Sequence, residues 1–151
     1  MTSARVVPVA VEAAFDRTLP VPLEELFKHW YGPIGPVRET VGDEQGWGSV
    51  GQTRTVIQSA GGGFTEELTR VDRPHAFGYR LTRPRGPLGA LITDIDGEWT
   101  FDPHPEGTLV TWRWDLHFRS ATAARTAPVI RRLWGGYARR SLAELEALVS
   151  T

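Results

Sequence analysis

The chain of 151 residues contains no cysteine, which excludes disulfide bonds, thiol nucleophiles and cysteine-ligated metal sites. It also lacks an excess of charge: a formal net charge of −1 provides no general attraction to nucleic acid or to an anionic membrane. No apolar run is long enough to cross a bilayer, and the short run near the start is interrupted by Pro8 and Glu12. We therefore expect a cytoplasmic protein with no membrane span and no nucleic-acid partner.

Several common motifs of catalytic and cofactor sites are also missing. The four histidines are scattered, without HExxH or another paired spacing, so the sequence predicts no metal site. The segment "WGSVG" at 47–51 does not match GxSxG, because Trp47 stands where the first glycine belongs. The "GGG" at 61–63 precedes an expected strand rather than a helix, which argues against a phosphate-binding loop. No cofactor is predicted.

What the sequence does contain is alternation of apolar and polar residues, with no internal repeat and no dividing linker. Residues 1–151 are therefore expected to form a single domain. The expected strands cover residues 6–17, 37–42, 50–58, 64–71, 76–82, 91–102 and 108–118. In the last of these, apolar residues at every second position predict one buried and one solvated face, as in an antiparallel sheet.

Two segments have helical spacing instead. Residues 23–30 follow Pro22 and predict a short helix, and a long amphipathic helix is expected from Pro128 to about residue 149. Its expected inner stripe consists of Ile130, Leu133, Trp134, Tyr137, Ala138, Ser141, Leu142, Leu145, Leu148 and Val149. Gly135 and Gly136 each cost about 1 kcal/mol relative to alanine in a helix interior, which predicts a bend or a close approach to another segment.

These elements predict an α+β fold. A sheet with one apolar face must be covered, and the last helix is the only long amphipathic element available to cover it. A strongly curved antiparallel sheet around a single helix leaves a space between the two.

The order of segments resembles a known family. "GSVGQTRTV" at 48–56 is followed by a glycine-rich turn, "TEELTRVDRP", an aromatic strand with "YRL", "EGTLVTW" and a terminal "LAELEALV". This series, over roughly residues 7–149, resembles the SRPBCC superfamily, whose START-related fold is called helix-grip, and within it the polyketide cyclase/dehydrase-like family. The resemblance implies a curved sheet of about seven strands around a long C-terminal helix, a short helical segment after the first strand, and an apolar cavity.

One arginine stands out within this pattern. Arg54 lies two residues before Val56, so both side chains point to the inner face of a strand. A turn centred at Ala60 places Glu66 directly across from Arg54, whereas a slip of one residue would place Glu67 there and turn the pair to solvent. A buried pair is costly to desolvate. It is either a structural clasp that fixes the register or a polar group that orients a ligand.

Large aromatic side chains converge on the same interface, either as plain core or as the wall of a pocket for a planar ligand. Trp30, Tyr31 and Trp47 are expected at the mouth of that pocket. The predicted ligand-binding residues are Trp30, Arg54, Glu66, Tyr79, Trp99, Trp112, Trp134 and Tyr137. Arg54 and Glu66 are also the candidates for a catalytic role.

Three functions remain open at this point. The first is a binding protein, monomeric or homodimeric, that holds an aromatic or lipid-like small molecule. The second is a cyclase, aromatase or dehydrase-type enzyme that uses the same cavity, with Arg54 and Glu66 as its polar groups. The third is a protein-interaction module that docks a partner through its aromatic mouth.

Overall fold

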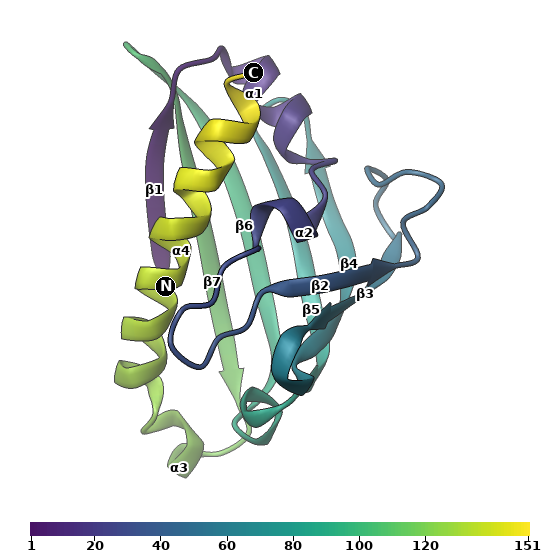
Figure 1. Ribbon diagram of the computed structural model, residues 1–151, viewed down its shortest axis with the longest axis vertical. Helices are drawn as coiled ribbons and strands as arrows, with labels where there is room; N and C mark the ends of the chain where they lie inside the picture. The colour runs from purple at the N-terminus through teal and green to yellow at the C-terminus, as the bar shows by residue number, and fades with distance from the viewer.

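The computed structural model describes residues 1–151, and its centre is one sheet of seven antiparallel strands in the order β1-β7-β6-β5-β4-β3-β2 (Figure 1). The strands are β1 (Thr2–Val7), β2 (Val37–Val41), β3 (Thr53–Gln58), β4 (Gly63–Asp72), β5 (Ala76–Arg85), β6 (Ile92–His104) and β7 (Gly107–Phe118). The predicted alternation holds along β7, where Val110 and Trp112 are buried while Arg113 and Asp115 are exposed. The predicted α+β helix-grip architecture is confirmed.

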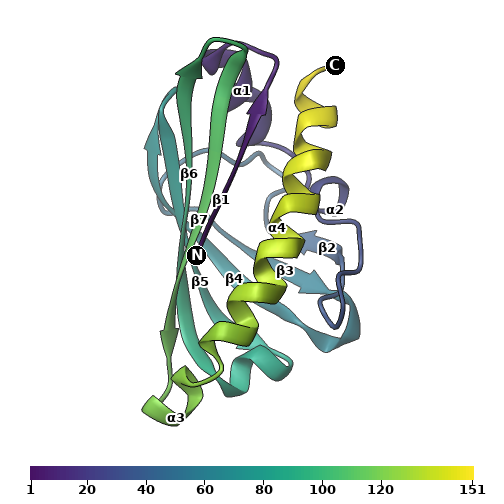
Figure 2. The ribbon, with the colours of Figure 1, turned by 90° about the vertical axis from the view of Figure 1, so that its left-hand side faces the viewer.

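The long helix α4 (Ala127–Val149) lies against the inner face of this sheet. Figure 2 shows the two as separate layers, with β2 and β3 curled toward the side of the sheet that α4 occupies. The predicted stripe is the buried one: Tyr137, Ala138, Leu142 and Leu145 are all less than 10% exposed. Before α4, the short helix α3 (Ala121–Ala124) begins at Ser120, whose side chain accepts a hydrogen bond from the N–H of Ala123.

The prediction for the first strand was wrong. Residues 6–17 do not form one strand: β1 ends at Val7, and residues 11–18 form the helix α1 (Val11–Thr18). Pro8 has no N–H to donate to a sheet, which ends the strand there. The residues that α1 buries, Ala14, Phe15 and Thr18, follow helical rather than strand spacing.

The second helical segment is shorter than predicted. It forms one turn, α2 (Leu23–Leu26), with Pro22 at its N-cap, and the chain leaves the helical conformation at Phe27. Strand β3 also starts later than expected, at Thr53, and Val50 is 62% exposed. Strand β5 continues to Arg85, beyond the expected end of the strand at residue 82.

The prediction of a close approach at the helical glycines is confirmed at one of them. A Cβ atom at Gly136 would lie 1.9 Å from the hydroxyl oxygen of Tyr31, so only glycine admits that ring against the helix. A Cβ at Gly135 would make only ordinary contacts, the nearest at 3.5 Å.

The register of the β3–β4 hairpin is the predicted one. Arg54 pairs with Glu66, and Val56 pairs with Phe64. Ala60 lies in the turn with a φ of 64°, so the chain reverses at the expected residue. The alternative register that would bring Glu67 opposite Arg54 is thereby excluded.

None of the helices combines the length and the apolar character needed to cross a membrane.

Candidate functional site

A cavity of about 140 Å³ lies between the sheet, the helical segments near the start of the chain and α4. Its wall is mostly hydrophobic, with twenty hydrophobic residues among twenty-four. The aromatic residues of the wall are Phe27, Trp47, Phe64, Phe77, Tyr79, Trp99, Trp112, Trp114, Trp134 and Tyr137. Flat aromatic rings with few polar groups between them suit an apolar ligand with a planar part.

All of the predicted ligand-binding residues except Trp30 line this cavity. Trp30 is 53% exposed and is absent from the wall. The reason is the early end of α2: once the helix stops at Leu26, Trp30 no longer shares the face that Leu23 and Leu26 turn to the core. Of the residues expected at the mouth, Trp47 reaches the wall of the cavity, while Tyr31 packs beside Gly136.

Arg54 and Glu66 form a bidentate ion pair inside the cavity wall. Arg54 Nη2 donates to Glu66 Oε1 at 2.9 Å and Arg54 Nε donates to Glu66 Oε2 at 3.3 Å, and both side chains are nearly inaccessible, at 5% and 6% exposed. Cross-strand pairing on β3 and β4 brings them together.

Two further residues complete this cluster. Arg54 Nη1 donates to Asp43 Oδ2 at 3.2 Å, and the guanidinium carbon lies 4.0 Å from the ring centroid of Trp47. Sequence reasoning did not find Asp43, because it belongs to a loop with no periodicity, and its proximity to Arg54 is decided by how that loop folds back. Two carboxylates thus face one guanidinium.

The electrostatics of this cluster depend on burial. Burial raises the pKa of the Glu66 carboxyl above its ordinary value, the charge of Arg54 opposes that shift, and the charge of Asp43 adds to it. Arg54 therefore favours the ionised form of Glu66 and opposes the effect of burial.

Tyr79 is the second polar centre in the cavity wall. The indole N–H groups of Trp112 and Trp114 donate to its hydroxyl oxygen at 2.7 and 2.8 Å. Burial raises the pKa of the Tyr79 phenol, so it stays protonated at neutral pH. Trp114 was not among the predicted ligand-binding residues, although the alternation on its strand placed it on the inner face.

Gly97 makes this arrangement possible. It lies between Tyr79 on β5 and Trp114 on β7, paired with both. A Cβ atom at Gly97 would lie 2.2 Å from Cζ of the tyrosine ring, so the ring lies directly over the glycine and its hydroxyl reaches across β6.

Gly97→Ala is therefore expected to displace the Tyr79 ring and break its hydrogen bonds. We expect a loss of about 1–3 kcal/mol in the free energy of unfolding, because overpacking forces the ring aside. The matched control is Gly78→Ala on β5, where an added Cβ would meet its nearest neighbours at an ordinary 3.5 Å. Chemical denaturation followed by tryptophan fluorescence measures both variants, and equal stabilities would contradict this account of Gly97.

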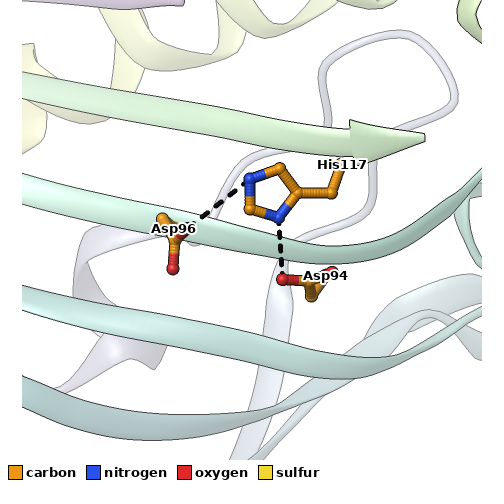
Figure 3. Close-up of side chains that lie close together, drawn as sticks. All are labelled: Asp94, Asp96 and His117. Atoms are coloured by element: carbon orange, nitrogen blue, oxygen red, sulfur yellow. Dashed lines mark hydrogen bonds and ion pairs between the residues drawn. The ribbon is translucent and has the colours of Figure 1, made fainter.

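A second charged cluster lies on the opposite face of the sheet. Figure 3 shows His117 between two aspartates, with its Nδ1 atom 2.8 Å from Asp94 and its Nε2 atom 3.6 Å from Asp96. Arg80 also donates from Nε to Asp94 at 3.1 Å. Hydrogen bonds from Thr93, Arg80 and His117 hold the pKa of Asp94 well below its ordinary value. These charges satisfy one another and link β5, β6 and β7 on a face that is remote from the cavity.

A curved antiparallel sheet that grips one long helix around a mostly apolar cavity defines the helix-grip class of proteins. The chain belongs to the family described as "polyketide cyclase / dehydrase and lipid transport", whose model matches residues 1–150. No curated protein matches the chain significantly in sequence.

Solved structures share the fold at low sequence identity. Ginseng major latex-like protein 151 from Panax ginseng is 14% identical, with a TM-score of 0.70 over 97% of this chain and 94% of that one. TTHA0849 from Thermus thermophilus is 18% identical, with a TM-score of 0.68 over 99% and 95% of the two chains. BexL, a di-domain ARO/CYC protein of the BE-7585A biosynthetic pathway, is 16% identical, with a TM-score of 0.69 over 100% of this chain and 50% of BexL.

Proposed function

We propose that this protein binds an apolar small molecule with an aromatic or lipid-like body in the cavity between the sheet and α4. The observation that carries the proposal is the cavity itself: about 140 Å³ of space walled by aromatic rings, with polar groups only at a few points. An engineered apolar cavity of about 150 Å³ binds benzene, so the space is sufficient for one aromatic ring. The family description, which includes lipid transport, supports the same proposal.

The test is binding of a neutral environment-sensitive dye with a single aromatic ring, 4-(dimethylamino)benzonitrile, measured by its polarity-dependent fluorescence. Val56→Phe adds volume inside the wall and is expected to weaken binding at least tenfold. The control Val129→Phe makes the same change on the surface, at a residue that is 63% exposed, and is expected to leave binding unchanged. Equal affinities in both variants would place the dye elsewhere and overturn the proposal.

A second candidate function is cyclase, aromatase or dehydrase-type catalysis in the same cavity. One observation favours it: the buried Arg54–Glu66 pair lines the cavity. BexL belongs by its name to an aromatase/cyclase type, which supports this alternative. Catalysis would depend on positioning a reactive poly-β-ketone and on proton transfer by Glu66. Conversion of a poly-β-ketone mimic, lost in Glu66→Gln, tests it, and dye binding without any conversion would leave the binding function alone.

A further inference from the structure

The hydroxyl group of Tyr79 has an unused hydrogen. Both of its hydrogen bonds, from Trp112 and Trp114, are bonds that its oxygen accepts, because an indole N–H can only donate. A phenol oxygen has two lone pairs, and the two indoles occupy both. The proton of Tyr79 is therefore left for a partner that the wall of the cavity does not supply.

A neighbouring donor is also unsatisfied. The indole nitrogen of Trp134 is buried without a hydrogen-bond partner, in a ring whose centroid lies 5.0 Å from that of Trp112 and 6.0 Å from that of Trp114. Buried donors without acceptors are rare in folded proteins, since each costs about 1–3 kcal/mol. This part of the wall thus has hydrogens to donate and lacks an acceptor.

The single basic residue of the cavity wall, Arg54, is by contrast already paired with carboxylates at each of its three nitrogens. Its Nε and Nη2 atoms donate to Glu66, its Nη1 atom donates to Asp43, and its face stacks on Trp47. No basic side chain besides Arg54 lines the cavity. A ligand carboxylate would find no unpaired cation there and would meet the carboxyl group of Glu66 in the wall.

We propose that the cavity selects a neutral ligand with a carbonyl-type oxygen, which accepts the hydrogen bond of the Tyr79 hydroxyl, and that it rejects carboxylate ligands such as free fatty acids. This inference rests on the proposed binding function and specifies its ligand class. The two indole bonds hold the hydroxyl in place and polarise it, which strengthens it as a donor.

Three probes of one size separate the parts of this inference. Acetophenone carries a carbonyl, α-methylstyrene has a CH₂ group in place of that oxygen, and benzoate carries a negative charge. Calorimetric titration of the wild-type protein at pH 7 is expected to show benzoate bound at least tenfold more weakly than acetophenone. In Tyr79→Phe, acetophenone is expected to lose about tenfold in affinity while α-methylstyrene changes by less than twofold.

Because Tyr79→Phe also frees the N–H groups of Trp112 and Trp114, a direct measurement on the wild-type protein accompanies it. The carbonyl stretch of bound acetophenone is expected at a lower wavenumber than in a hydrocarbon solvent, as hydrogen bonding requires. A stretch equal to that in the hydrocarbon, or equal losses for acetophenone and α-methylstyrene in Tyr79→Phe, overturns the role of Tyr79.

A separate variant tests the proposed discrimination against carboxylate ligands. Glu66→Gln removes the main partner of Arg54, so benzoate is expected to bind at least tenfold more tightly than to the wild-type protein. If the wild-type protein binds benzoate as tightly as acetophenone, the proposed selectivity for neutral ligands is overturned. Failure of all three probes to bind would overturn the proposed binding function itself, whereas binding of α-methylstyrene with no advantage from the carbonyl would overturn only this inference.

Discussion

Leu145→Asp is expected to leave the chain largely unfolded at neutral pH. Leu145 is completely buried on the inner stripe of α4, where an aspartate side chain would have no charged partner and no water. The lost apolar contacts and the buried charge together are expected to cost about 5 kcal/mol, which is comparable to the whole stability of a marginal domain. Circular dichroism and thermal denaturation measure the effect.

Two controls separate burial from the change of residue type. Ala143→Asp places the same side chain on the exposed face of α4, where helix propensity and an added negative charge near the helix C-terminus are the only penalties, and is expected to cost about 1 kcal/mol. Leu145→Met keeps the apolar character and the volume and is expected to cost less than about 1.5 kcal/mol. A Leu145→Asp protein that melts together with Ala143→Asp would show that α4 does not cover the sheet as described.

Arg54→Met is expected to have the second largest effect, about 3–5 kcal/mol. The change leaves the Glu66 carboxylate buried without its counter-ion, and breaking such a pair from one side is strongly destabilising. Glu66→Gln is expected to cost less, since Arg54 keeps its bond to Asp43. Because the two residues are in contact, the double variant is expected to be more stable than the sum of the single losses predicts. Strictly additive losses would contradict the coupling.

The cost of Arg54→Met is also expected to depend on pH. Arg54 lowers the pKa of Glu66 and burial raises it, so removal of Arg54 leaves a carboxyl whose pKa in the folded state lies well above the 4.5 of a free glutamate. The folded state then binds the proton more tightly than the unfolded state does, so the variant gains stability relative to wild type as the pH falls from 8 to 5.

Denaturation midpoints across this pH range measure that dependence. The control is Arg73→Met, which removes an arginine from a bidentate pair with Asp16 on the surface, with side chains 56% and 47% exposed. Its midpoint is expected to stay close to that of the wild-type protein at every pH. A flat profile for Arg54→Met as well would mean that Glu66 is solvated once its partner is gone.

Much of the fold follows from local patterns in the sequence. The alternation of apolar and polar residues along 108–118 is compatible with a half-buried strand and with little else. The apolar stripe of α4 follows from helical spacing along the length of the helix. The Arg54–Glu66 register could be predicted because a short hairpin fixes which residues face each other. The first helix was missed since its apolar residues also alternate, and Pro8 was the signal that separated strand from helix.

Part of the candidate site also follows from local patterns in the sequence. By itself the sequence determined which side chains face inward on each strand and on the last helix, because side-chain direction follows from the period of the element. It therefore placed Arg54, Glu66 and the inner aromatic residues on the cavity wall. It misplaced Trp30, whose position depends on where one helical turn ends, and that end is decided by packing rather than by propensity.

Only the tertiary structure decided which of these inward groups meet. Asp43 reaches Arg54 from an irregular loop, and Tyr79 crosses a neighbouring strand to reach Trp112 and Trp114 because Gly97 leaves room for its ring. Contacts of this kind join residues far apart in the sequence, and they depend on the shape of the intervening backbone. No periodicity encodes them, so the pairing of Arg54 with two carboxylates and the free hydroxyl proton of Tyr79 became visible only once the chain was folded.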